Sequence, residues 1–152
     1  MLTKILKRAF VDDLRILRKE IELYPREGDM WQRSGAIANS AGNLALHQAG
    51  AIRFLVGHVL GGISYHRDRE TEFNQTGVPR AELLDQIDAA IDAVRRTLDA
   101  LTEEDLEREY PEDVGATVPI TTATFLVRLA MHTSYHNGQV NYHRRLLGDL
   151  SA

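Results

Sequence analysis

The stretch from Thr121 to Leu147 most constrains the fold, because its polar residues recur where a helix would bury them. Residues at alternating three- and four-residue spacing share one face of a helix packed in a bundle. Apolar residues begin and end this face, but its middle is histidine and glutamine. A buried imidazole without partners costs about 1–3 kcal/mol. Several buried histidines on one helix face therefore indicate that these side chains have binding partners or a functional role. The face comprises Thr122, Phe125, Leu129, His132, His136, Gln139, His143 and Leu146.

A metal ion is the sharpest explanation for the pair His132 and His136. Residues four apart on a helix differ by about 40° in direction and by about one turn along the axis. Both rings can therefore converge on one ion. An isolated pair of this kind also occurs among ordinary core or surface histidines, so the pair alone leaves both interpretations open.

The remaining apolar pattern predicts an all-α four-helix bundle with long crossover connections, formed as a single domain over residues 1–152. Pro25, Gly61-Gly62 and Pro79 divide the helical segments. The expected helices span residues 3–24, 39 or 40–60, 79–101, a short 102–109, and 121 or 122–147. The expected inward residues are Leu2, Ile5, Leu6, Phe10, Leu14, Leu17 and Ile21 in the first helix and Leu84, Ile87, Ile91, Val94, Leu98 and Leu101 in the third.

Glycines inside the second helix indicate that another element approaches it closely. Gly42, Gly50 and Gly57 lie within the segment, and each glycine costs a helix about 1 kcal/mol relative to alanine. The approach would come from another helix of the same fold or from a second subunit.

Composition excludes several classes of function. The net charge is −4 and there is no cysteine, so nucleic-acid binding, disulfides and thiolate metal sites are not expected. No apolar run reaches the roughly 18 residues of a membrane span, and the N-terminal segment has no signal-peptide core. We therefore expect a cytoplasmic protein that binds neither nucleic acid nor membrane.

A third ligand would have to come from the second helix or the loop after it. His47 and His58 share a face but lie about 16 Å apart along the axis, so one ion cannot bind both. His47 lies inside the predicted bundle, whereas His58 is near the helix end and His66 is in the loop. Three imidazoles leave the fourth position of a tetrahedral metal free, as in catalytic rather than structural zinc sites.

Further polar residues are candidate partners of these rings. Metal-bound imidazoles usually donate their second N–H to a nearby acceptor, and helical spacing suggests Asn43 for His47 and Gln139 for His136. His143 lies about 10 Å along the axis from His136, which favours a hydrogen-bonded or interface role. The chain has no Glu-x-x-His or His-Glu-x-x-His motif, which argues against a di-iron centre and a zinc protease.

The segments Ala41–His47 and Met131–Gln139 resemble the DinB/YfiT-like superfamily of metal-binding four-helix bundles. In that family one histidine comes from the second helix and two from a His-x-x-x-His motif in the fourth, often followed by Gly-Gln. The resemblance assigns His47, His132 and His136 as metal ligands, and Gly138-Gln139 matches the trailing pair. It also implies a divalent metal, most often zinc or nickel, and a homodimer.

Known relatives imply a thiol-dependent S-transferase that uses a low-molecular-weight thiol as cosubstrate. Arg69 or Arg67 would then neutralise a carboxylate of that cosubstrate, although a surface ion pair with Glu70 or Glu72 is the plain alternative. The same ligand set also suits a hydrolase using metal-bound hydroxide. A non-catalytic, stress-linked bundle with a structural metal, or a metal-free interaction module, remains a competing interpretation.

Overall fold

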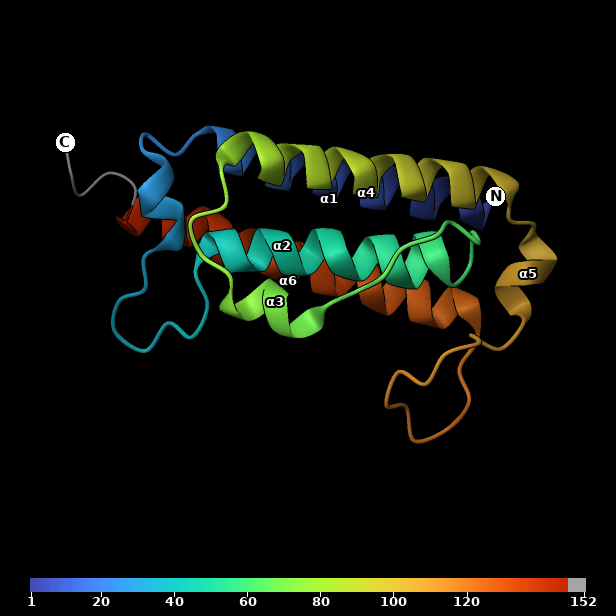
Figure 1. Cartoon of the computed structure of the whole chain (residues 1–152). Helices are drawn as coiled ribbons and strands as arrows, with labels where there is room; N and C mark the ends of the chain where they lie inside the picture. Colours follow the sequence, from blue (N-terminus) through green and yellow to red (C-terminus); the bar gives the residue numbers. More distant parts are fainter. Residues whose placement is uncertain (148–152) are drawn as a thin grey trace.

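Four long helices form the bundle in the computed structural model, which describes residues 1–147. They are α1 (Leu2–Glu22), α2 (Ala41–Ile52) continued by the π-helix η2 (Arg53–His58), α4 (Arg80–Ala100) and α6 (Thr122–Leu147). α1 packs against α4 and α6, and α2 packs against the same two helices. Each long helix therefore has two neighbours, with α1 and α4 in one layer and α2 and α6 in the other (Figure 1).

The connections contain the shorter elements η1 (Glu27–Trp31), α3 (Arg69–Asn74) and α5 (Glu103–Glu107). α2 and α4 run in the same direction, so the chain returns along the bundle between them, and α3 lies on this return segment against α2 (Figure 1). The predicted all-α four-helix bundle with a long crossover is thus confirmed, and the described residues form no β-strand. The prediction of one domain over residues 1–152 includes residues 148–152, which lie outside the described part.

Local sequence explains where the helices begin. The Ser40 hydroxyl accepts a hydrogen bond from the Asn43 N–H at 3.2 Å, which caps α2. Thr102 and Asp105 form a reciprocal capping box at α5. Pro79 precedes α4 as expected for a residue with no N–H to satisfy. The observed ends lie within about two residues of the predicted ones, but the predicted second helix changes from α-helix to the π-helix η2 after Ile52.

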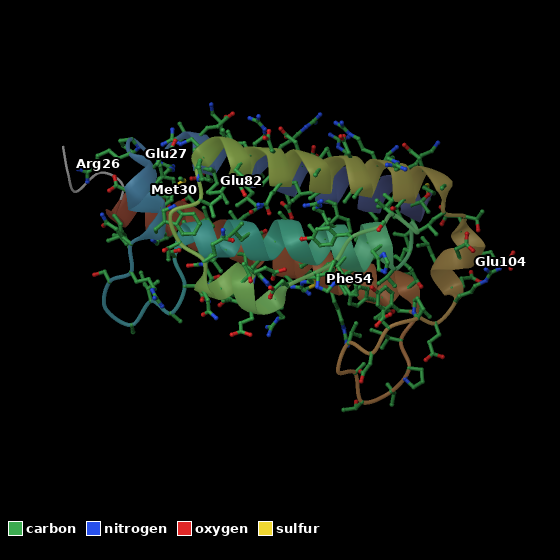
Figure 2. All side chains as sticks on the ribbon, in the orientation of Figure 1. Arg26, Glu27, Met30, Phe54, Glu82 and Glu104 are labelled. Carbon is green, nitrogen blue, oxygen red and sulfur yellow. The ribbon has the colours of Figure 1, made fainter. Side chains whose placement is uncertain are left out.

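Side chains fill the space between the two layers, with Met30 near one end of the bundle and Glu104 projecting outward on α5 at the other (Figure 2). Two of the apolar side chains predicted to face inward, both near helix ends, are exposed. Ile5 is 57% exposed and Leu146 is 57% exposed, while in α4 the adjacent Leu83 rather than Leu84 is fully buried. A strict three-four pattern drifts relative to a 3.6-residue turn, so residues at helix ends leave the core.

The glycines of α2 and η2 do mark close approaches. A Cβ on Gly42 would lie 2.6 Å from the Trp31 ring, and one on Gly57 would lie 3.0 Å from Ala93 of α4. α2 is buried along its whole length, which explains why small residues occupy more than one of its faces. No described helix combines the length and apolar character that crossing a membrane would need.

Candidate metal centre

Three histidines from α2 and α6 converge where these helices pack together. Nε2 of His132 lies 3.3 Å from Nε2 of His47 and 3.0 Å from Nε2 of His136. One nitrogen from each ring falls within 4.8 Å of the others. The structure therefore brings together the three residues predicted as ligands, although their binding of a metal stays a prediction.

The three rings differ in exposure. His47 is 7% exposed and His136 is 9% exposed, so both belong to the interior. His132 is exposed, which corrects its predicted place in the buried face of α6. Because its Nε2 still points at the other two rings, His132 forms the solvent side of the cluster.

Glu72 of α3 holds the His47 ring in position. Its carboxylate lies 3.1 Å from His47 Nδ1 and accepts two hydrogen bonds from Arg67, at 2.8 and 3.0 Å. A carboxylate only accepts, so His47 Nδ1 carries the proton and Nε2 presents a lone pair to the cluster. Arg67 Nη2 also lies 3.4 Å from His47 Nδ1, but a hydrogen bond there would require Nδ1 to accept. Because the contact with the Glu72 carboxylate is shorter, we assign the proton to Nδ1.

The sequence analysis considered Glu72 only as a surface ion-pair partner of Arg67 or Arg69; the pair with Arg67 exists, but Glu72 is buried and its contact with His47 was missed. Asn43, proposed for this role by helical spacing, instead donates to the Glu72 and Gln75 backbone carbonyls at 3.0 and 2.7 Å. Asn43 thereby fixes α3 against α2 rather than contacting the ring. A Cβ on Gly50 would collide with the Glu72 carboxylate, so the glycine makes room for this acid. Gly50 was the one sequence signal that something approaches α2 here.

Gln139 occupies the predicted position beside His136. Its carbonyl oxygen lies 2.6 Å from His136 Nδ1, and its amide donates to the Tyr135 hydroxyl at 3.2 Å. His136 Nδ1 is therefore the donor, and its Nε2 also presents a lone pair to the cluster. Gln139 is exposed rather than part of the buried face, so it reaches the ring from the surface.

The surroundings favour neutral His132 and His136 rings and a charged Glu72 carboxylate. Burial lowers the pKa of His132, and the nearby His136, His47 and Arg67 lower it further. Burial also lowers the pKa of His136, against the opposing effect of its hydrogen bond with Gln139. Burial alone would raise the pKa of Glu72, but the hydrogen bonds from His47 and Arg67 outweigh it and hold the pKa below its usual value.

The remaining histidines lie apart from this cluster. His143 is buried and has both ring nitrogens paired, with the Tyr24 hydroxyl at 2.6 Å and the Gln32 carbonyl at 2.8 Å. His58 is exposed, with Nδ1 3.1 Å from the Ile63 carbonyl. His66 is exposed in the crossover segment. The hydrogen-bonded role predicted for His143 matches these contacts.

A cleft of about 580 Å³ opens beside His132. Arg69, the candidate substrate contact, lines this cleft, and its guanidinium lies 5.3 Å from the centre of the Phe73 ring. Arg128 of α6 lines it too. Sequence reasoning did not single out Arg128, because an arginine one turn before His132 is indistinguishable from a solvated helix residue.

Fold and cluster together define a helical bundle with a three-histidine site between its second and last long helices. The sequence matches the DinB superfamily over residues 14–140, and the chain belongs to that superfamily. The structure is similar to a crystal structure of a conserved protein from Enterococcus faecalis, with a TM-score of 0.76, 19% identity, and coverage of 95% of this chain and 96% of that one. At this identity the similarity shows the fold alone. Comparison with curated proteins gives no match.

Proposed function

We propose that this protein binds one divalent transition-metal ion through Nε2 of His47, His132 and His136. Imidazole ligands suit zinc and nickel, the two metals that the family resemblance favours. The proposal extends to catalysis, with the protein acting as a metal-dependent transferase that activates a low-molecular-weight thiol.

The close approach of the three Nε2 atoms is the observation that supports metal binding. His47 and His136 each donate from Nδ1, so each directs an Nε2 lone pair towards His132 Nε2. His132 can donate its single Nε2 proton to only one of them. At least one nitrogen would then face another without a proton between them. A cation among the three atoms would satisfy all of them at once, so the donor set fits a metal.

Three ligands and an open side support a catalytic role. Structural zinc sites have four protein ligands, whereas catalytic sites keep a position for water or substrate. Beside the cluster, the cleft lined by His132 provides access from solvent. A metal bound here would lower the pKa of a coordinated thiol or water towards neutrality, and this chain, which has no cysteine, would not need its own thiol nucleophile.

The chain's own residues prepare this chemistry. Glu72 fixes the tautomer of His47, and Gln139 fixes that of His136. Arg67 balances the buried charge of Glu72 through two hydrogen bonds. Such outer partners orient metal-binding rings and increase their basicity.

Elemental analysis of protein purified without an affinity tag tests metal binding. We expect about one zinc or nickel per chain in the wild type and a large loss in His136→Ala. Equal metal content in both proteins would remove the proposal. Screening the metal-loaded protein for thiol conjugation of electrophiles and, separately, for ester and amide hydrolysis then distinguishes a transferase from a hydrolase using bound hydroxide.

We also propose that the protein forms a homodimer through α6. The exposed side chains of Val127, Met131, Tyr135 and Tyr142 lie on one face of this helix, and each is at least 43% exposed. Large apolar side chains grouped on a surface often mark an interface. Light scattering should give twice the chain mass for the wild type and the monomer mass for Met131→Glu; a monomeric wild type would reject the dimer.

A further inference from the structure

The cleft beside His132 has a charge pattern that the three-histidine cluster does not explain. Arg67, Arg69 and Arg128 line it, together with the acidic residue Asp113. Arg67 is paired with Glu72. Within the described part of the chain, neither Arg69 nor Arg128 has an acidic partner at ion-pair distance. Two guanidinium groups thus share one cleft, and neither is ion-paired with a carboxylate in the described part of the chain.

Asp113 offsets only one of these two positive charges. It lies on the exposed segment after α5, and its carboxylate accepts a hydrogen bond from the Gly115 N–H at 2.8 Å. That contact orders the turn that forms one wall of the cleft. The cleft keeps an excess of positive charge, and guanidinium groups bind oxyanions in preference to neutral ligands because their fixed donors match two oxygens.

The floor of the cleft is apolar. Phe125 and Leu129 of α6 are 7% and 6% exposed, and Leu55 of η2 lies beside them in the lining. The Phe125 ring stacks on Tyr110 with centroids 3.8 Å apart, and the Tyr110 hydroxyl donates to the Leu55 carbonyl at 2.8 Å. These contacts make the floor rigid, and a rigid apolar surface with a few polar groups at its edge is typical of small-ligand sites.

From this arrangement we propose that the cleft binds a small amphipathic oxyanion. Arg69 and Arg128 hold its anionic group, Leu55, Phe125 and Leu129 contact its hydrocarbon part, and its other end reaches His132. The proposal deepens the proposed function by naming the substrate class of that same site. It makes Arg69 and Arg128 residues that determine specificity, and it does not require a particular metal.

Binding of matched probes to metal-free protein, dialysed free of chelator, tests this inference. The probes are 4-phenylbutyrate, its neutral amide, and 3-phenylpropyl phosphate, followed by calorimetry and by the NMR signals of the arginine Nε–H groups. We expect the carboxylate to bind about tenfold more tightly than the amide, equivalent to about 1.4 kcal/mol. The phosphate arm shows which of the two oxyanions is preferred.

The double variant Arg69→Gln/Arg128→Gln should lose this preference for anions while keeping weak binding of the amide. Arg96→Gln is the matched control, because Arg96 is exposed on α4 and lines no part of the cleft. Melting temperatures check that each variant folds. Equal affinity for acid and amide, unchanged binding by the double variant, or no saturable binding of any probe would overturn the inference.

The outcomes separate this inference from the proposed function. Arginine-dependent binding of the acid by a protein that takes up no zinc or nickel when these ions are added would reject the metal site and support the cleft. A protein that binds metal through the three histidines, but binds the acid independently of both arginines, would support the metal site and reject the proposal for the cleft.

Discussion

Two buried histidines of α6, His136 and His143, lie seven residues apart and have opposite environments. Both ring nitrogens of His143 have fixed partners, because the Gln32 carbonyl requires a proton on Nε2 and the Tyr24 hydroxyl donates to Nδ1. His136 has the other tautomer, with Nδ1 donating to Gln139 and Nε2 facing two further rings. Burial alone therefore does not identify a ligand. What distinguishes His136 is an Nε2 atom that faces other ring nitrogens, and its proposed role as a ligand rests on that contact.

Replacing one histidine from each region should give opposite results, and this is the largest expected effect. His132→Ala should weaken zinc binding by more than about 100-fold, since even the loss of an outer partner costs 10–100-fold. His143→Ala should retain zinc but lose about 2–3 kcal/mol of unfolding free energy, because it leaves buried partners unpaired. Zinc calorimetry and urea denaturation of the metal-free proteins measure both. If His143→Ala lost zinc as completely as His132→Ala, the distinction between the regions would fail.

Glu72→Gln should weaken zinc binding by about 10–100-fold, the range found for partners of metal-bound histidines. The glutamine amide lacks the negative charge of the Glu72 carboxylate, which binds both Arg67 and His47, so it holds the His47 ring less firmly. Glu70→Gln is the control, because Glu70 is exposed on the same short helix. Competition titration with a coloured chelator gives the affinities. Equal affinities for the two variants would mean that Glu72 has no part in the site.

Tyr24→Phe should destabilise the protein by about 1–2 kcal/mol without changing its zinc affinity. The change removes the donor to His143 Nδ1 and leaves that buried nitrogen unpaired. The exposed Tyr142 provides the control variant Tyr142→Phe, which should unfold like the wild type. A change in zinc affinity in Tyr24→Phe would connect the two regions that we treat as separate.

A smaller effect concerns pH. The folded, metal-free protein lowers the pKa of His132 and His136 below 6.5, so the unfolded chain binds more protons between the folded and unfolded values. The stabilisation from these rings is complete above pH 6.5 and is lost as the pH falls through the lowered values. Urea denaturation at pH 7.5 and 5.5 should show a smaller loss in His132→Ala/His136→Ala than in the wild type. An equal loss would assign the acid sensitivity to other groups.

Sequence predicted those features that depend on local spacing. Helical geometry predicted that the His132 and His136 rings converge and that Gln139 contacts His136. It also predicted the capping serine of α2. Glu72 could not be predicted in this way, because it lies on α3, 25 residues further along the chain, and its approach to His47 depends on the path of the crossover segment. The exposure of His132 was missed for a similar reason, since the helical pattern does not say where the neighbouring helix ends its contact.

A crystal structure of the zinc-loaded protein, with anomalous diffraction recorded above and below the zinc edge, tests the central claim most directly. We expect one strong anomalous peak per chain, about 2.0–2.1 Å from Nε2 of His47, His132 and His136. A fully loaded protein whose zinc peak lies elsewhere, or whose cluster retains three contacting rings without a peak, would contradict the account.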